Sequence, residues 1–292
     1  MVSGSMSITY RPMREEDLRP AFDLQLRSFI DLDRRRGAHE VGPLPDPDIA
    51  LLRFRRLLEA DPGGAWVAER DGALAGVALA LLRDGFWGLS LLVVDPPAQG
   101  GGAGRELLAR AWEYGDGARG HVILSSSDPR AIRAYARLGM ELHPAIAAKG
   151  RPQGIAEPDG VRTGGPDDLP LTESVDRAVR GAAHGGDVLA MLASGHELLV
   201  APERGYALLR GGELRLLAAF EDEAARELLR AALARIAQRG EDANLLFITA
   251  RQQWAVEVCV EARLELEADC GCVFTRGDVG PMAPYLPSGA YL

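Results

Sequence analysis

The alternation of hydrophobic and polar positions in the first half of the chain predicts strands and helices that follow one another in turn. Hydrophobic residues at helical spacing mark helices, and short apolar runs that end in Gly, Pro or Asp mark strands. Asp71-Gly72 is a strong hairpin signal between two of the strands. The elements predicted in this way are strands at residues 7–14, 66–70, 74–82, 89–94 and 121–126 and helices at 22–30, 49–58, 105–112 and 129–138. This pattern favours an α/β fold.

Residues 91–108 combine the end of a strand, a glycine-rich loop and the start of a helix. The apolar run ends at Asp95 and two prolines, which suits a buried strand but not a continuing helix. Four glycines lie within the five residues 100–104, so the backbone can adopt positive φ angles and no side chain blocks a ligand. A loop of this kind before a helix leaves N–H groups free, and free N–H groups suit a phosphate.

Two familiar phosphate-binding motifs do not fit this loop. A Walker A loop ends in Gly-Lys-Ser/Thr, whereas Gly104 is followed by Arg105 and Glu106. A dinucleotide fingerprint needs a third glycine three residues after the second, and none of the possible frames supplies it. The structural alternative is a glycine-rich surface turn.

The pattern that does fit is Gln/Arg-x-x-Gly-x-Gly/Ala, present from Gln99 to Gly104. A second pattern follows on the predicted helix at 129–138, as Asp128-x-x-Ala-x-x-x-Tyr135-x-x-x-Gly139-Met. In this order, the two resemble the acyl-CoA loop and the following helix of the GCN5-related N-acetyltransferase (GNAT) superfamily. The resemblance covers residues 7–149 and implies a mixed, mostly antiparallel sheet flanked by helices.

The resemblance also implies a site for acetyl-CoA, as the acyl-CoA co-substrate. The backbone of Leu92, Val93 and Val94 is expected to hold the pantetheine arm and to stabilise the oxyanion that forms during attack. Tyr135 is expected to protonate the departing thiolate, and its structural alternative is a tyrosine that packs on the sheet. Asp128 stands where the family commonly has Asn, which keeps an acceptor and loses a donor. The residues expected to bind the cofactor at the loop are Gln99, Gly100, Gly101, Gly102, Ala103, Gly104 and Arg105.

The sequence does not identify a general base. In acetyltransferases of this type the loop between the first two helices commonly forms a wall of the acceptor pocket, and a solvated linker is the alternative here. Four carboxylates lie near that loop or near predicted strand ends, and each has the alternative of a solvated surface group. These candidates are Asp31, Glu40, Glu69 and Asp84. A water relay is a further route for the proton.

The second half of the chain echoes the first. Residues 150–160 have the composition of a linker. The segments that match are 162–169 with 11–18, 200–205 with 67–72, and 255–266 with 131–142. We therefore expect two tandem GNAT-like domains, a catalytic one at 7–149 and a degenerate copy at 161–292.

The copy in the second half has lost the residues that the chemistry needs. Its predicted strand at 214–220 is followed by Glu221, Asp222 and Glu223 without a glycine, and three carboxylates would repel a pyrophosphate. Cys259 stands where the first half has Tyr135. A single acyl-CoA site, in the first half, is therefore expected. The tail at 280–292 is rich in Pro and Gly, yet its tyrosines and leucines indicate that it packs against the core or between the domains.

Charge and composition narrow the possible partners and the location. The net charge is −9, and residues 150–292 carry 14 basic and 22 acidic residues, which argues against a nucleic-acid partner and favours a cationic amine. The sequence shows no apolar run of membrane-spanning length and no signal peptide. Three cysteines cannot build a disulfide framework, and Cys270-x-Cys272 has no nearby histidine to suggest a metal site. We expect a cytoplasmic protein without a metal or membrane partner.

These observations predict an acetyl-CoA-dependent N-acetyltransferase that acts on the amine of a small molecule. The alternative is a protein that binds acyl-CoA without turnover, as a sensor or scaffold. Asp128 and the missing base favour that alternative, whereas Tyr135 and the intact loop oppose it. The sequence does not identify the acceptor, the acyl chain or the oligomeric state.

Overall fold

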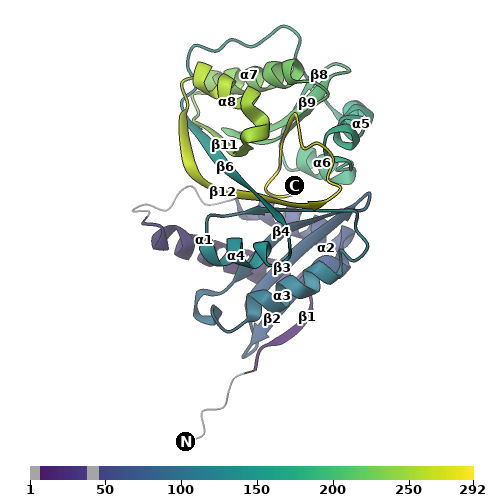
Figure 1. Ribbon diagram of the computed structural model, residues 1–292, viewed down its shortest axis with the longest axis vertical. Coiled ribbons are helices and arrows are strands. Elements are labelled where there is room, and N and C mark those ends of the chain that lie inside the picture. Colours follow the sequence, from purple (N-terminus) through teal and green to yellow (C-terminus); the bar gives the residue numbers. More distant parts are fainter. Residues whose placement is uncertain (1–6, 38–45) are drawn as a thin grey trace, which may run out of the picture. The chain divides into compact units, whose positions relative to one another are not determined.

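The computed structural model describes residues 7–37 and 46–292, which form two compact units (Figure 1). Unit 1 comprises the chain up to Leu82 together with Trp87–Ala118. Unit 2 comprises Arg83–Phe86 together with Arg119–Leu292. Most of the loop that was expected to form a wall of the acceptor pocket lies outside the described residues.

Unit 1 contains the strands and helices that the hydrophobic pattern predicts, in the mostly antiparallel sheet that the resemblance implies. β1 pairs antiparallel with β2, β2 with β3, and β4 lies next to β3. Asp71 and Gly72 both have positive φ, 56° and 77°, so the expected tight hairpin joins β2 to β3. The elements are β1 (Thr9–Pro12), α1 (Leu18–Arg35), α2 (Pro47–Ala60), β2 (Ala65–Arg70), β3 (Ala73–Arg83), β4 (Phe86–Val94) and α3 (Ala103–Glu113).

Unit 2 is built on a sheet with the order β5-β12-β6-β11-β10-β9-β8-β7. Its neighbouring strands are antiparallel except for β10 and β11, which are parallel. The strands are β5 (Gly120–Ser125), β6 (Glu141–Gly150), β7 (Arg162–Thr163), β8 (Glu197–Ala201), β9 (Gly205–Arg210), β10 (Glu213–Ala219), β11 (Ala243–Thr249), β12 (Glu265–Gly277) and β13 (Tyr285–Leu286). The helices are α4 (Pro129–Ala136), α5 (Leu169–Arg180), α6 (Gly186–Ala193), α7 (Asp222–Gln238) and α8 (Gln253–Glu261). The predicted fold class, a mixed and mostly antiparallel sheet flanked by helices, is confirmed.

The elements from β7 to β12 repeat the order of those from β1 to β6: a strand, two helices, three strands, then helix, strand, helix and strand. Local contacts repeat as well. Arg11 pairs with Asp17 at 2.6 Å, and Arg162 pairs with Asp168 at 2.5 Å. In each case the carboxylate also accepts a backbone N–H three residues earlier. The predicted internal repeat is confirmed, whereas the domain boundaries at residues 7–149 and 161–292 stay a prediction.

The two halves exchange their last strands. β12, from the second half, pairs with β5 and β6 of the first half, with Val273 opposite both Leu124 and His143. β6, from the first half, pairs in turn with β11 of the second half, with Ile146 opposite Ile248. The repeat makes β5 the counterpart of β11 and β6 the counterpart of β12. Each of these penultimate strands therefore has the last strand of the other half beside it.

The core of the second half lies between its sheet and two helices. In Figure 1, α7 and α8 lie side by side, and they share one buried cluster with β8 to β11. Alanines alternate with leucines on α7, and small side chains let a helix approach a sheet closely. The buried residues of α7 are Ala224, Ala225, Leu228, Leu229, Ala231, Ala232, Leu233, Ala234 and Ile236.

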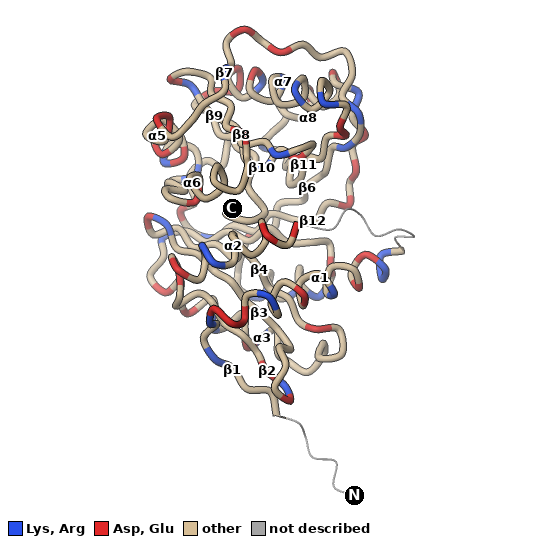
Figure 2. Tube along the Cα trace, turned by 180° about the vertical axis from the view of Figure 1, so that it is seen from behind, with Lys and Arg blue, Asp and Glu red and all other residues tan. Residues whose placement is uncertain are grey.

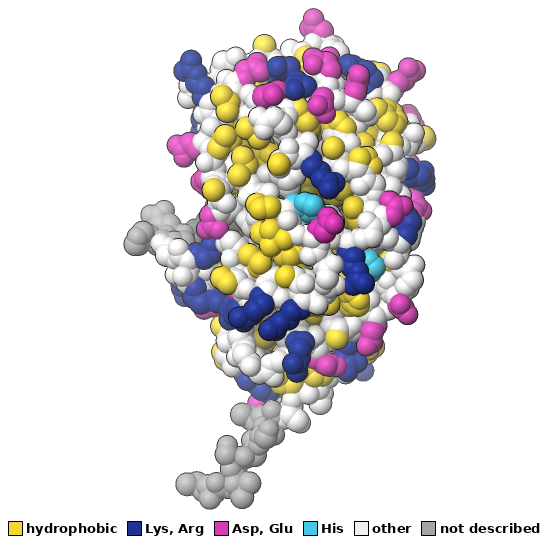
Figure 3. All heavy atoms as spheres, viewed as in Figure 1, with side chains coloured by type: hydrophobic (Ala, Val, Ile, Leu, Met, Phe, Trp, Pro, Cys, Tyr) yellow, Lys and Arg dark blue, Asp and Glu magenta, His cyan; other side chains and the backbone are white. Residues whose placement is uncertain are grey.

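The surface mixes charges with scattered hydrophobic side chains. Figure 2 shows acidic and basic residues intermixed on α1, α5 and α7. Ion pairs from Arg226 to Glu257 and from Arg230 to Glu261 link α7 to α8. Figure 3 shows hydrophobic side chains on the face that carries β11 and α8, where Leu246 is 40% exposed. In the part of the chain that the structure describes, no helix is long and apolar enough to cross a membrane.

The C-terminal tail packs on the core of unit 2. β13 pairs antiparallel with β10, and the side chain of Tyr285 is completely buried. Leu286, Tyr291 and Leu292 are each at most 5% exposed. The prediction that the tail packs against the core is confirmed.

Candidate active site

The glycine-rich loop of unit 1 presents a row of free backbone donors. Gly100 and Gly102 have φ of 85° and 91°, a region that side chains rarely adopt, and Gly102 is the N-cap of α3. Its carbonyl accepts hydrogen bonds from the N–H groups of Arg105 and Glu106. The five N–H groups of residues 100–104 donate no hydrogen bond to any described residue. These donors and the positive end of the α3 dipole suit an anion.

Side chains around the loop fix its position on β4. The Gln99 side-chain amide donates to the carbonyl of Val94 at 2.9 Å, and the Ser28 hydroxyl donates to the same oxygen at 3.3 Å. Ala103 is buried, so only its N–H can serve a ligand. Arg105 is exposed and forms no ion pair with the described residues, which leaves its charge available to a phosphate. The Gln99 side chain thus supports the loop, and its contact with the cofactor stays a prediction.

The three expected backbone positions on β4 lie at the strand end that leads into this loop. Val93 is buried, while Leu92 and Val94 are half-buried, so the side chains alternate between the faces of the strand. The turn Pro96–Ala98 then directs the chain to Gln99 and the glycines. The end of β4 and the loop therefore form one continuous backbone surface.

Tyr135, on α4 of unit 2, is buried, with 6% of its surface exposed. Its ring packs edge-on against Phe274 of β12, with 5.7 Å between the ring centroids. Its hydroxyl has no hydrogen-bond partner among residues 7–37 and 46–292. Burial raises the pKa of the phenol well above its usual value, and the negative charge of Asp128 raises it further. Tyr135 therefore keeps its proton at neutral pH and is a donor with a free hydroxyl.

Asp128 caps α4. Its carboxylate accepts the N–H of Arg130 at 2.9 Å and pairs with the Arg130 guanidinium at 2.7 Å. Asn and Asp are equally good N-caps, so the exchange from the family's usual Asn keeps the helix start. The contact of Asp128 with a cofactor stays a prediction.

The second half carries different groups at the corresponding places. Glu221, Asp222 and Glu223 are exposed at the start of α7, without a glycine loop before them. Cys259 is buried on α8, and burial raises the pKa of its thiol to about 12, which keeps it protonated and unreactive. Cys270 and Cys272 are free thiols on β12, as expected for ordinary cysteines in a strand.

The carboxylates considered as a general base are engaged by other groups. Asp31 pairs with Arg35 at 2.8 Å, and Glu69 pairs with Arg11 at 2.5 Å. Asp84 accepts the N–H of Ala183 at 3.1 Å and also pairs with Arg177. Glu40 lies outside the described residues.

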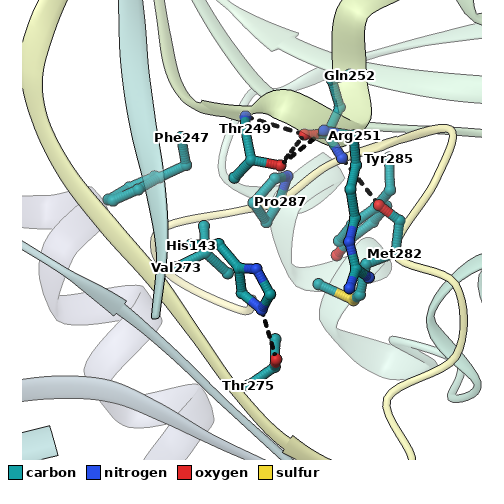
Figure 4. Close-up of a pocket in the computed structure, with 10 residues that line it drawn as sticks. All are labelled: His143, Phe247, Thr249, Arg251, Gln252, Val273, Thr275, Met282, Tyr285 and Pro287. Carbon is teal, nitrogen blue, oxygen red and sulfur yellow. Dashed lines mark hydrogen bonds between the residues drawn. The ribbon is translucent and has the colours of Figure 1, made fainter. Parts of the chain in front are cut away.

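A pocket of unit 2 contains a titratable group that the sequence did not single out (Figure 4). His143, on β6, lies 2.8 Å through its Nε2 from the Thr275 hydroxyl on β12, and the two share a hydrogen bond. Burial lowers the pKa of His143, the charge of Arg251 lowers it further, and Glu141 opposes this shift. The pocket encloses about 300 Å³, part of it open to solvent, and its other lining residues are Phe247, Thr249, Gln252, Val273, Met282, Tyr285 and Pro287.

The pocket and Tyr135 are on opposite faces of the same strand. Successive residues of a strand point to opposite faces, so Val273 and Thr275 face the pocket while Phe274 faces Tyr135. No sequence signal identified His143, because a lone histidine in a strand is more often structural than functional. Among the described residues, no group of three His, Cys, Asp or Glu side chains could hold a metal ion.

Part of this chain matches a known family of acetyltransferases. Residues 23–140 match the family model described as Acetyltransferase (GNAT) family. The resemblance of this chain to the GNAT superfamily is thereby confirmed, and enzymes of that family use acetyl-CoA.

Solved structures share the fold over nearly the whole chain. A structure from Pyrococcus horikoshii, named a proposed acetyltransferase, has a TM-score of 0.76 at 17% identity, over 97% of this chain and 95% of that chain. A GCN5-related N-acetyltransferase from Sphaerobacter thermophilus has a TM-score of 0.59 at 16% identity, over 93% and 96%. A tandem GNAT protein from the clavulanic acid biosynthesis pathway has a TM-score of 0.59 at 14% identity, over 93% and 99%. No curated protein matches the chain.

Proposed function

We propose that this protein transfers an acetyl group from acetyl-CoA to the amine of a small molecule, at a single site in its first half. The observation that carries the proposal is the row of five free N–H groups at residues 100–104, at the start of α3. A pyrophosphate needs several convergent donors and a positive helix end, and this loop offers both. Arg105 adds an exposed positive charge.

The backbone of Leu92, Val93 and Val94 is proposed to bind the pantetheine arm. The arm contains amide groups, which pair with a strand backbone as another strand would. One N–H of this segment is proposed to donate to the thioester oxygen as negative charge develops on it. These roles fit the continuity of the β4 end with the loop.

Tyr135 is proposed to donate its proton, or a strong hydrogen bond, to the thiolate that leaves. An ordinary thiol has a pKa of about 8.5, and the phenol of Tyr135 has a pKa raised above about 10, so complete transfer is uphill. A donor with no partner among the described residues still stabilises the thiolate, because a hydrogen bond to a charged group is stronger than one between neutral groups. Tyr135 therefore acts mainly through position.

His143 is proposed to accept the proton of the amine. A primary amine arrives as an ammonium ion at neutral pH, with a pKa near 10.4, and cannot attack until a proton is removed. Burial holds His143 in its neutral form, which is the form that accepts a proton.

A protein that binds acyl-CoA without turnover is the second candidate. The observation that favours it is that the described carboxylates expected as bases are engaged in ion pairs or backbone hydrogen bonds. Such a protein would bind acetyl-CoA through the same loop and release no thiol.

A thiol-release assay with acetyl-CoA against a panel of amines, polyamines, aminoglycosides and amino acids separates the two candidates. Turnover that falls in Tyr135→Phe, and not in the control Tyr114→Phe, supports the enzyme. Tyr114 is a suitable control because its hydroxyl donates to Asp61 in unit 1 and has no proposed role. Acetyl-CoA binding without thiol release for any amine would support the sensor or scaffold.

A further inference from the structure

The sheet of unit 2 opens between its two parallel strands. β10 and β11 share a single pair of facing residues, Glu213 with Asn244. Beyond that pair β11 continues beside β6, and β10 leaves β11. A pocket lined by Leu214, Asn244 and Phe247 lies in the opening.

The tail of the same chain enters this opening as a strand. Leu286 of β13 lies opposite Leu217, and Tyr285 lies opposite Ala218. The N–H of Ala219 donates to the carbonyl of Pro284 at 3.2 Å. The side chain of Leu286 belongs to the buried cluster beneath α7 and α8. The end of β10 is therefore covered along its free edge.

The repeat identifies which residues of the first half correspond to this segment of β10. β10 occupies the place of β4 in the order of elements. The ends of the two strands set the correspondence, since β4 ends at Val94 and β10 ends at Ala219. Residues 217–219 therefore correspond to residues 92–94, the segment proposed to bind the pantetheine arm.

We infer that tail residues 284–286 occupy, in the second half, the strand position that the acyl-CoA arm takes in the first, so that the chain closes its own second cleft. The inference rests on the proposed function for the role of residues 92–94. A peptide strand and a pantetheine arm both pair through amide groups, so one can replace the other along a strand edge. The hydrophobic Leu286 fills the opening, and the acidic start of α7 then has no pyrophosphate to repel.

Contacts on both sides of the inserted segment hold it in place. The N–H of Met282 donates to the carbonyl of Val179 at 2.7 Å, and the Gln252 amide donates to the carbonyl of Met282 at 2.8 Å. On the other side, the Tyr285 hydroxyl donates to the carbonyl of Leu292 at 2.6 Å.

Buried polar groups of the α5 side extend this anchor. His184 lies 2.8 Å through its Nε2 from the same Leu292 carbonyl oxygen, and its Nδ1 lies 2.8 Å from a carboxylate oxygen of Asp176. Both side chains are at most 1% exposed. The tail is therefore tied down by a satisfied polar network and is not an incidental contact.

A disulfide tests the inference in the full chain. In the variant Leu217→Cys/Leu286→Cys the two residues face each other, and facing residues of an antiparallel pair have Cα atoms roughly 5.5 Å apart, which a disulfide spans. In the control Leu216→Cys/Leu286→Cys one cysteine points to the opposite face. Peptide mapping by mass spectrometry after mild oxidation reads out the bond.

We expect the disulfide to form in the facing pair and not in the control. Acetyl-CoA stoichiometry and turnover are then expected to be the same in the oxidised and reduced forms of the facing variant. The reason is that the tail stays beside β10 while the first half binds and uses acetyl-CoA. Loss of binding or turnover on oxidation would show that the second cleft is used and would overturn the inference. A facing pair that does not form the bond would overturn it as well.

Hydrogen exchange of the unsubstituted protein tests the inference without any substitution, so its result does not depend on whether the variants fold. Peptides that cover residues 214–220 and 282–287 are both expected to be protected, and rapid exchange of the tail peptide would contradict the inference. These readouts need no acetyl-CoA. If the chain binds no acetyl-CoA in any form, the proposed function fails while the position of the tail is still decided.

Discussion

Replacing Gly102 tests whether the loop before α3 holds an anion. The substitution Gly102→Glu places a carboxylate at the N-cap of α3, next to the free N–H groups of the loop. The substitution Gly102→Gln places a neutral group of the same size at the same φ of 91°. Both variants carry the same backbone strain, of about 1–2 kcal/mol for a residue with a left-handed backbone. The difference between them is therefore the charge.

The expected difference follows from Coulomb's law. A carboxylate about 5 Å from one unit of phosphate charge raises the free energy of the complex by about 3 kcal/mol at an effective dielectric constant of 20. Because 1.4 kcal/mol corresponds to a factor of ten, the Kd for acetyl-CoA should be about 100-fold higher in the Glu variant than in the Gln variant. Added salt should reduce this ratio, since the loop is exposed.

Isothermal titration with acetyl-CoA measures the two Kd values, and thermal unfolding confirms that both variants fold. Gly117→Glu is the control for a carboxylate at positive φ elsewhere, because Gly117 has φ of 78° and open space around it. Its Kd should match that of the unsubstituted protein. Equal Kd values for the Glu and Gln variants of Gly102 would refute the assignment of the pyrophosphate to this loop.

Three further substitutions test the other assignments. Tyr135→Phe should lower kcat by about 10²-fold or more without changing the Kd for acetyl-CoA, because a general acid contributes about 10²- to 10⁴-fold. Initial-rate assays measure kcat, and titration measures the Kd. A kcat equal to that of Tyr114→Phe would show that Tyr135 takes no part in the reaction. His143→Gln should lower kcat/KM. Because the pKa of His143 is held below its usual value, the unsubstituted enzyme should stay active as the pH falls through 6.5, and a pH profile unchanged by the substitution would contradict its role as base. Phe274→Ala should lower the free energy of unfolding by about 3–5 kcal/mol in urea titration, since the ring is fully buried, and an effect no larger than that of the exposed Leu266→Ala would contradict this packing.

Local signals in the sequence were sufficient to predict most of the helices and strands. Asp71-Gly72 identified the first hairpin because a two-residue turn needs positive φ at both positions, and the structure has both. The glycines at 100–104 identified the loop for the same reason. The degenerate repeat was visible because matching residues kept their spacing, although the chemistry around Cys259 had changed.

Contacts between distant segments could not be predicted in this way. The pairing of β12 with β5 joins Val273 to Leu124, and neither strand carries a signal that names its partner. The motif that contains Gln99 likewise did not predict that its side-chain amide donates to the carbonyl of Val94, because a motif fixes the residue type and not the direction of its side chain. The role of Tyr285 in the tail likewise depends on β10, which lies far away in the sequence.

Because the two halves exchange their last strands, each half needs the last strand of the other to complete its sheet. If the second half were deleted, β5 would lose β12, and its backbone groups would become an unpaired sheet edge that invites aggregation. If β6 were lost from the first half, β11 would likewise become an unpaired sheet edge. Selection on one half therefore also preserves the fold of the other, although the second half has no glycine loop before α7 and has Cys259 where the first half has a tyrosine. Each half is kept because it supplies the strand that completes the sheet of the other.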